Sequence, residues 1–556
     1  MLPRIGSRAR LLVLVALCVP FALAGCGEAA DAAPRVGEDG DPTGGTALVD
    51  RDAFPARPAA STADEARTEV ALRDPRNGAW NADLRGLVNR WVDRAREKTG
   101  GKAHRDNVHV GLHVVDLETG VVLAALDDAT ARRPASGLKL VTTAAALVLF
   151  GPEAEFATPF EAAGAVEARR LVGDLVVRAS GDPLIEPDQS PRIEGRVRVA
   201  ARELVAAGVE TITGDVVLDE GTFLTPAPGP EWPSANQHWQ AYCALSGGFS
   251  VNGGVLSATV TPTRPGEPAR VELHPVPHGL RSILRPRTVA KGKLTIGGEA
   301  RSGRVLVQGD IPSRNRPFEA RFSHPDPVDH FGAVLLGALG DAGVRVEGEI
   351  RRARNVRGGP RLATLRSSVA ASFRPINAES DNGAADQLFL ALGHATGHGG
   401  TREGGQRATM DALRQLGVPT AGLVQVDGSG LSRANRIAPA QFTALLRGAM
   451  RLSPESRAVY LDSLAVAGEV GTLEDRMRGT SAQGRVAGKT GWIAGTSSLS
   501  GIVRTLEGRI LVFSCLIEYP KLDGLNTSVF KPMTDALCVQ MVERSFPGIG
   551  EGRDSR

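Results

Sequence analysis

"RPASGLKLVTTAAALVLF", residues 133–150, places Ser136 and Lys139 three positions apart at the start of an apolar run typical of a buried helix. Side chains with this spacing lie on one face of a helix, so the hydroxyl and the amine are expected side by side. Of the 65 basic residues only eight are lysines. A guanidinium stays protonated, whereas burial or a nearby cation can deprotonate a lysine. The stretch therefore predicts a serine that Lys139 can deprotonate.

Two more motifs follow in order along the chain. Ser-Asp-Asn at residues 380–382 opens the helix-like NGAADQLFLALGHA, and Lys-Thr-Gly at residues 489–491 lies in the strand-like RVAGKTGWIAG. Singly, each has a structural interpretation, as a helix cap or as a lysine that protects an edge strand. In the catalytic interpretation Lys489 is the second cation that lowers the pKa of Lys139. The conjunction of the three motifs favours the catalytic interpretation.

S-x-x-K, S-D-N and K-T-G in this order form the signature set of penicillin-binding proteins and serine β-lactamases, and the chain resembles this penicilloyl-serine transferase superfamily. A β-lactamase carries S-D-N soon after its serine, whereas in this chain the motif begins only at Ser380, far along the sequence from Ser136. This layout is similar to the class C low-molecular-mass penicillin-binding proteins, the D-alanyl-D-alanine carboxypeptidase/endopeptidase family. The likeness covers residues 80–546, and its supporting stretches are LVGDLVVRASGDP, ITGDVVLDEGTF, EWP before AYCALSGGFSVNGG, VDGSGLSRANRIAP and KTGWIAGTSSLSG.

The resemblance implies a serine-type hydrolase that cleaves D-alanyl bonds of peptidoglycan stem peptides through an acyl-serine intermediate, binds β-lactam antibiotics covalently and needs no cofactor. It implies Ser136 as the nucleophile and Lys139 as its general base. The backbone N–H groups of Ser136 and Trp492 would form the oxyanion hole. The other roles implied are proton transfer and binding at Ser380 and Asn382, a cation at Lys489, and substrate binding at Thr490, Gly491 and Trp492.

Two residues depart from the pattern of this family. The residue after K-T-G is usually small, and Trp492 is expected to narrow the cleft. Where relatives often have an aspartate after the W-P of the insert, this chain has Asn236. The second departure leaves charge recognition of the diamino acid in the stem peptide without its usual carboxylate.

The pattern of apolar residues predicts an α/β (α+β) fold. A helix is expected in NADLRGLVNRWVDRAREKTGG, a hairpin around residues 118–120, and a strand meander with a closing helix after residue 485. With the resemblance, this predicts a β-lactamase/transpeptidase-like domain, an antiparallel sheet flanked by helices. We place its two parts at 79–160 and 365–556. A mixed insert at 161–364, with a small all-β subdomain at about 251–325, would split the domain.

The N-terminus has the order of an export signal, with Arg4, Arg8 and Arg10 before an apolar run that is too short to span a membrane comfortably. The run ends in LAGC, which resembles the lipobox of bacterial lipoproteins. It predicts a signal peptide at 1–25, lipidation of Cys26 and a flexible linker over 26–78. An ordinary signal peptide is the alternative. We expect an exported, periplasmic or cell-envelope protein that is held to a membrane only through its lipid.

Composition argues against other classes of partner. The 65 basic and 62 acidic residues nearly balance, without a basic block, so a nucleic-acid partner is not expected. Cys243, Cys515 and Cys538 are odd in number and widely spaced, which predicts neither a disulfide framework nor a metal site. His394 and His398 lie four apart among glycines without a third ligand, so no metal is predicted.

Two other functions stay open from the sequence. One is a β-lactamase, which would turn penicillin over rapidly. The other is a catalytically inactive lipoprotein that keeps the fold and only binds cell-wall peptides. The presence of Ser136, Lys139, Ser380 and Lys489 together favours the enzyme, since a binding protein needs no pair of lysines.

Overall fold

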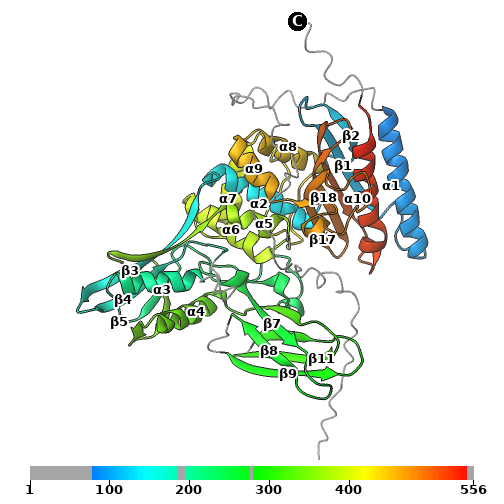
Figure 1. Cartoon of the computed structure of the whole chain (residues 1–556). Coiled ribbons are helices and arrows are strands. Elements are labelled where there is room, and N and C mark those ends of the chain that lie inside the picture. The colour runs from blue at the N-terminus through cyan, green and yellow to red at the C-terminus, as the bar shows by residue number, and fades with distance from the viewer. Residues whose placement is uncertain (1–77, 185–194, 276–279, 302, 547–556) are drawn as a thin grey trace, which may run out of the picture. The chain divides into compact units, whose positions relative to one another are not determined.

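The computed structural model describes residues 78–184, 195–275, 280–301 and 303–546 (Figure 1). The predicted signal peptide, the lipidation site Cys26 and nearly all of the predicted linker lie outside the described residues. Within the described ranges, none of the helices combines the length and the apolar character that crossing a bilayer requires.

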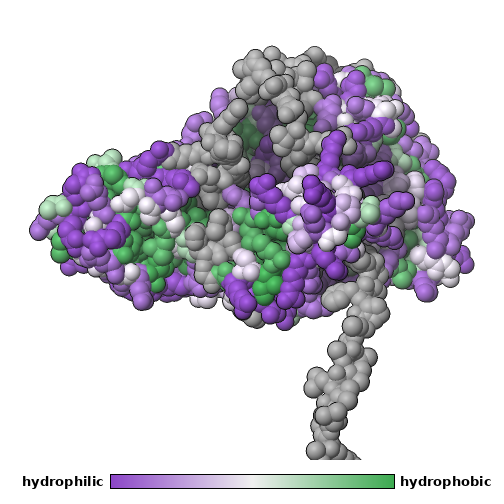
Figure 2. Space-filling view, turned by 60° about the horizontal axis from the view of Figure 1, so that its bottom comes forward, coloured by the Kyte–Doolittle hydropathy of each residue, from purple (hydrophilic) through white to green (hydrophobic). Residues whose placement is uncertain are grey.

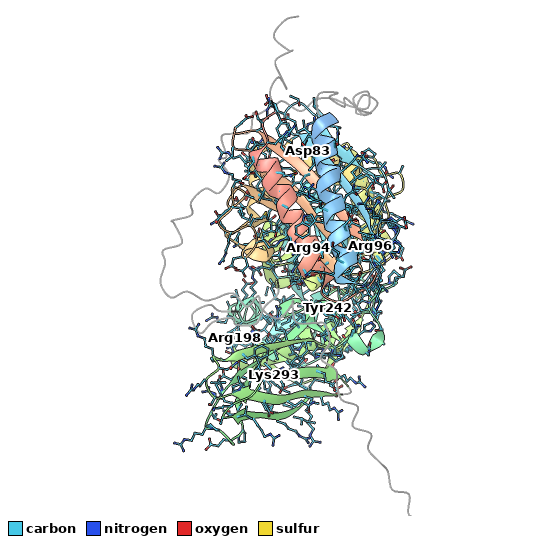
Figure 3. All side chains as sticks on the ribbon, turned by 90° about the vertical axis from the view of Figure 1, so that its right-hand side faces the viewer. Asp83, Arg94, Arg96, Arg198, Tyr242 and Lys293 are labelled. Atoms are coloured by element: carbon cyan, nitrogen blue, oxygen red, sulfur yellow. The ribbon has the colours of Figure 1, made fainter. Side chains whose placement is uncertain are left out.

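The first sheet has six antiparallel strands in the order β16-β17-β18-β19-β1-β2. Its strands are β1 His109–Asp116, β2 Val122–Leu126, β16 Ala465–Val466, β17 Val486–Ile493, β18 Thr496–Arg504 and β19 Ile510–Glu518. The helices α1 Gly78–Lys98 and α10 Lys531–Glu543 lie side by side on one face (Figure 1, Figure 3). The sheet is covered on both faces, which explains why β19 reads as the continuous apolar run ILVFSCLIE.

A helical layer covers the opposite face of this sheet. It contains α2 Lys139–Phe150, α5 Phe373–Asn377, α6 Asn382–Ala395, α7 Arg402–Gln415, α8 Pro439–Met450 and α9 Pro454–Asp462. Helix α2 is apolar all round because α6, α7, α8 and α9 surround it. The sequence analysis above does not predict α8 and α9, although each begins with a proline at its first turn.

The second sheet belongs to the insert and contains seven strands. They are β3 Glu155–Glu167, β4 Arg170–Arg178, β5 Thr211–Ile212, β6 Val216–Asp219, β13 Arg345–Val346, β14 Ile350–Ala353 and β15 Arg361–Ser368. Helices α3 Arg196–Ala206 and α4 Pro327–Asp341 pack on one face. The boundaries expected at 161 and 364 fall inside β3 and β15, which pair with each other, so the chain enters and leaves the insert side by side.

The Gly-Asp pattern that recurs in LVGDLVV and ITGDVV is explained by close approach of neighbouring parallel strands. A Cβ on Gly214 would lie 2.2 Å from Asp174 Oδ1 and 2.7 Å from the Gly173 carbonyl oxygen. The two carboxylates then share one cation, because Arg351 donates to Asp174 and to Asp215 at 2.9 Å each. The repeat is therefore a feature of sheet packing.

The insert also carries a small all-β unit, residues 255–323. Strands β7 Val255–Thr261, β8 Arg270–His274 and β12 Phe318–Ser323 form one sheet, and β9 Arg281–Val289, β10 Gly297–Arg301 and β11 Arg304–Pro312 form another. Buried side chains from both sheets make one core, among them Leu256, Val260, Val305 and Val307.

Candidate active site

The first motif lies where a tight turn becomes a buried helix. Ala135, with φ +47°, begins the 3₁₀ turn η4 Ala135–Leu138, and Lys139 is the first residue of α2. This geometry places the Lys139 Nζ 3.1 Å from the Ser136 Oγ. Lys139 is fully buried, while Ser136 is partly exposed, so the hydroxyl can be reached from outside and the amine cannot.

Lys139 has two further hydrogen-bond acceptors. Its Nζ lies 2.6 Å from the Asn382 Oδ1 and 2.8 Å from the Ser429 carbonyl oxygen. Burial lowers the pKa of Lys139 to about 8, against the opposing effect of the carboxylates Asp386, Asp381 and Asp427. A fraction of the Lys139 amines is therefore neutral near neutral pH.

Two buried carboxylates hold the loop that carries the Ser429 carbonyl. Asp386 Oδ1 accepts from the backbone N–H groups of Gly428 and Ser429 at 2.8 and 2.7 Å. Asp427 accepts from the backbone N–H groups of Gly430 and Ser432 at 2.9 and 2.7 Å. Burial and the charge of Asp427 raise the pKa of Asp386 to about 7, against the opposing effect of the charge of Lys139. A Cβ on Gly430 would lie 1.9 Å from the Ala135 carbonyl oxygen, so the loop fits only with glycine at this position.

Sequence reasoning did not assign a role to Asp386 or Asp427. In the sequence, VDGSGLSRANRIAP supports only the resemblance to the family. The available signal was an aspartate on the apolar helix α6, where a charge is tolerated only with partners.

The third motif occupies β17 beside η4. Lys489 is fully buried, and its Nζ donates to the Thr490 carbonyl oxygen at 3.0 Å. Burial, together with the charge of Lys139, holds the pKa of Lys489 well below its usual value. The expectation that the charge of Lys489 is what lowers the pKa of Lys139 is not met, because burial is the largest cause at Lys139 and Lys489 is itself held toward its neutral form.

Gly491 allows β17 to approach η4, the turn that carries Ser136. A Cβ at this position would lie 2.2 Å from Ser498 Oγ, 2.6 Å from the Pro134 carbonyl oxygen and 2.8 Å from the Gly137 nitrogen. Ser498 Oγ also donates to the Pro134 carbonyl at 2.7 Å. Gly491 is expected to bind substrate. In the structure it also lets β17 pack closely against η4.

The second motif comes from the start of α6. Asp381 caps the helix by accepting from the Ala384 N–H at 2.9 Å, and Asn382 Nδ2 donates to the Tyr242 carbonyl at 2.8 Å. Asn382 therefore connects Lys139 to the insert. Ser380 is partly exposed with φ +66°, and its hydroxyl makes no hydrogen bond to another described residue. Thr490 Oγ1 donates to Thr472 Oγ1 at 2.9 Å.

The two departures from the family pattern lie at the surface. Trp492 is 42% exposed, so its side chain stands outside the core of the sheet while its backbone stays paired opposite Ser497 in β18. Asn236 is exposed in the short turn η5 Ala235–Gln237, where its Oδ1 accepts from Ser234 Oγ at 2.7 Å. Neither residue takes part in the hydrogen bonds around Lys139.

The remaining candidates have structural surroundings. His394 Nδ1 lies 2.9 Å from Thr222 Oγ1 and its ring packs on Phe223, whereas His398 faces Asp411. No group of three or more potential metal ligands was found in the part of the chain that the structure describes. The described cysteines, Cys243, Cys515 and Cys538, are buried and free.

Comparisons with known proteins agree with this site. Residues 102–537 match the D-Ala-D-Ala carboxypeptidase 3 (S13) family. A D-alanyl-D-alanine carboxypeptidase from Actinomadura sp. is 33% identical over 460 residues, which cover 80% of this chain and 82% of that protein. The crystal structure of penicillin binding protein 4 from Haemophilus influenzae has a TM-score of 0.67 at 21% identity, covering 79% of this chain and 98% of that chain. Its complex with a β-lactam has a TM-score of 0.62 at the same identity, covering 79% and 97%.

These matches confirm three predictions: the family, the transpeptidase-like α/β fold and a hydrolase of the D-Ala-D-Ala carboxypeptidase/endopeptidase type. With the matched region spanning all three motifs, the chain belongs to the D-Ala-D-Ala carboxypeptidase 3 (S13) family.

Proposed function

We propose that Ser136 is the nucleophile and Lys139 the general base of a serine D-Ala-D-Ala carboxypeptidase/endopeptidase that acts on peptidoglycan stem peptides. One observation carries this assignment. A neutral lysine amine has two N–H donors and one lone pair, and Asn382 Oδ1 and the Ser429 carbonyl lie 2.6 and 2.8 Å from the Nζ to accept those two donors. The lone pair is then directed at the Ser136 Oγ, 3.1 Å away.

In the acylation step, the Ser136 Oγ attacks the carbonyl carbon of the penultimate D-alanine while its proton passes to the Lys139 Nζ. The oxyanion receives hydrogen bonds from the backbone N–H groups of Ser136 and Trp492. The C–N bond then breaks, and the leaving amine takes a proton that Lys139 returns, with the Ser380 hydroxyl as the relay. A water molecule, activated by the same amine, hydrolyses the serine ester and releases the shortened peptide.

The substrate backbone binds along β17. Strand β16 pairs only with residues 487 and 488 of β17, so residues 489–493 have no strand partner on that edge among the described strands. An extended peptide can add to such an edge through its main chain. Thr490 then contacts the terminal carboxylate, and Lys489 and Gly491 line the strand beneath it.

Labelling with a fluorescent penicillin tests the assignment. The wild type is expected to form a durable adduct that survives denaturing electrophoresis, and Ser136→Ala is expected to form none. Absence of an adduct with the wild type would favour a binding protein without activity. Rapid hydrolysis of penicillin without a lasting adduct would favour a β-lactamase. An adduct that persists in Ser136→Ala would overturn the choice of nucleophile.

Digestion of purified muropeptides distinguishes the two peptidase activities. Release of free D-alanine from pentapeptides identifies carboxypeptidase action, and conversion of cross-linked dimers to monomers identifies endopeptidase action. Both products are expected to disappear in Ser136→Ala. Cleavage of neither substrate by an enzyme that still binds penicillin would contradict peptidoglycan stem peptides as the substrate.

The location in the cell follows from the N-terminus and from the family. We propose export through the signal at 1–25 and anchoring by acyl chains on Cys26, with the catalytic unit in the cell envelope. Mass spectrometry of the mature N-terminus is expected to find a diacylglyceryl cysteine. A mature chain that begins elsewhere without lipid would favour an ordinary signal peptide.

A further inference from the structure

The whole chain is nearly neutral, but its small all-β unit is strongly basic. Residues 255–323, the small all-β unit, contain twelve basic and five acidic residues, whereas the whole chain carries 65 and 62. All twelve basic side chains are exposed. Figure 3 shows the side chains of this unit projecting from its strands, with Lys293 labelled. The remainder of the chain is therefore slightly acidic, and the positive charge is concentrated in one place.

Strand register gathers five of these residues on one surface. Ala300, Val305 and Thr288 are buried on the inner side of the β10-β11-β9 sheet, so residues of the opposite parity point outward. Arg301 pairs with Arg304, and Arg304 pairs with Arg281, which makes a row of arginines across all three strands. We call this outward surface the basic face; it comprises Arg281, Arg285 and Arg287 of β9, Arg304 of β11 and Arg301 of β10, with Ile283 and Leu306 between them. The same alternation places two acidic residues on this face, Glu299 of β10 and Asp310 of β11, so the five arginines outnumber the carboxylates.

The arginines of the basic face are largely unpaired within the described residues. Arg287 alone has an acidic partner there, Asp310 at 3.9 Å. Like charges directly opposite each other on a sheet are destabilising, so this row has a cost in the isolated protein. In the seven-stranded sheet, by contrast, Arg178 forms ion pairs with both Glu161 and Asp219. An anion bound at the basic face would relieve the repulsion between these arginines.

Apolar side chains accompany the charge. Ile283 of the edge strand β9 and Leu306 of β11 are cross-strand neighbours between the arginines of the basic face. Figure 2 brings the side on which β9 lies toward the viewer and shows apolar patches bordered by hydrophilic surface. A polymer of phosphates would need only the charge. A bilayer surface offers anionic headgroups and, beneath them, an apolar layer that accepts such side chains.

We propose that the basic face docks onto a bilayer that contains anionic phospholipids. The arginines would bind lipid phosphates, with Ile283 and Leu306 at the boundary between headgroups and acyl chains. Such a contact adds a second attachment to the acyl anchor expected at Cys26 and would hold the small β unit itself against the bilayer surface. The proposal does not depend on the roles assigned to Ser136 and Lys139.

Co-sedimentation with vesicles tests this proposal. The mature chain, without the expected signal peptide at 1–25, carries Cys26→Ser throughout, because an acyl chain or the apolar run of the signal would retain any variant. Vesicles of phosphatidylglycerol and phosphatidylcholine in equal parts are expected to bind it, vesicles of phosphatidylcholine alone are not, and added salt should release it. The triple variant Arg281→Gln/Arg301→Gln/Arg304→Gln should lose about fivefold in affinity per charge removed, or roughly a hundredfold in all.

A matched variant removes three exposed arginines elsewhere: Arg85→Gln/Arg90→Gln/Arg96→Gln on α1. It is expected to bind the anionic vesicles like the parent chain, and both variants should acylate with a soluble fluorescent penicillin at the parent rate, which shows that they fold. Three outcomes would overturn the proposal: no binding by the parent chain, equal losses in the two variants, or competition by soluble poly(glycerol phosphate) that removes the chain from the vesicles completely.

Discussion

At Lys139, burial and the charges of nearby carboxylates favour opposite forms of the amine. Burial disfavours the ammonium, whereas Asp386, Asp381 and Asp427 favour it, and the balance leaves the pKa at about 8. At neutral pH a fraction of the enzyme therefore carries the free base. The two acceptors Asn382 Oδ1 and the Ser429 carbonyl fix its orientation, so the neutral fraction is already aligned with Ser136.

Lys139→Arg tests the need for proton loss. Arginine keeps the positive charge and can still reach carbonyl acceptors, but it stays protonated and cannot act as a base. We expect the second-order rate of penicillin acylation to fall by at least about a hundredfold, the lower range for loss of a general base. Lys98→Arg on α1 is the control and should change nothing. Retention of more than a tenth of the wild-type rate would show that Lys139 acts only through its charge.

Asp386→Asn tests the electrostatic setting of Lys139. Its Oδ1 can still accept from the Gly428 and Ser429 N–H groups, so the loop is retained while the charge is lost. Acylation needs the neutral amine, so its rate rises with pH and levels off above the pKa of about 8. Because the Asp386 charge raises this pKa, its removal should move the inflection to lower pH.

The measurement is the rate of acylation by penicillin between mildly acidic and alkaline pH. Asp341→Asn, an exposed change at the end of α4, should leave the profile in place. An inflection that stays fixed in Asp386→Asn, with only a lower plateau, would indicate a structural role for this carboxylate without an influence on Lys139.

Among the elements, β17 and η4 depend on each other's backbone. The strand brings Lys489 and Thr490 beside the turn that carries Ser136 only because Gly491 lets it come close to Pro134 and Gly137. The paired partner Ser498 in β18 reinforces the contact by donating to the Pro134 carbonyl. The active site is therefore assembled by packing between an edge region of the sheet and a helical turn.

Gly491→Ala should separate these two elements. The added Cβ would clash with backbone atoms that cannot move aside, and overpacking of this kind costs about 1–3 kcal/mol. We expect a lower melting temperature and a strongly reduced rate of penicillin acylation. Gly340→Ala on α4 is the matched control, since a Cβ there meets nothing within 4 Å and should be neutral or stabilising. Unchanged acylation in Gly491→Ala would show that the contact has no part in assembling the site.

In the molecule as a whole, α6 joins the catalytic helices to the insert. Asn382 Nδ2 donates to the Tyr242 carbonyl, and the buried Gln387 makes a reciprocal pair with the backbone of Gly247, its Nε2 2.6 Å from the carbonyl and its Oε1 3.2 Å from the nitrogen. The insert thus contacts the same helix that positions the partner of Lys139. We propose on this basis that the insert supports the catalytic helices in addition to bordering the cleft.

Gln387→Ala tests this coupling. Loss of the amide leaves a buried N–H and C=O of Gly247 without a partner, which costs about 1–3 kcal/mol for each group. We expect the urea midpoint of unfolding to fall, together with the acylation rate. Gln415→Ala, at the exposed end of α7, should lie within about 0.5 kcal/mol of the wild type. A full stability loss with an unchanged acylation rate would show that the insert stabilises the fold without influencing the site.

The sequence predicts the three motifs but not the residues that hold them in place. Lys139 and Lys489 could be singled out because lysine is rare and the motif spacing is local. Asp386, Asp427 and the Ser429 carbonyl could not, since a carboxylate that binds backbone N–H groups has no sequence pattern of its own. The effect of burial on the pKa values of the two lysines could not be predicted either, because the sequence does not show how deeply each amine is buried.

The sequence by itself determined the family, the order of the motifs and the spacing that places Ser136 and Lys139 one helical turn apart, because these depend on neighbours along the chain. Only the tertiary structure decided which acceptors hold the lysine amine, how closely β17 approaches the turn and which arginines share one face of the small β unit. The physical reason is that burial, hydrogen bonding and strand register join residues far apart in the sequence, and these contacts exist only once the chain has folded.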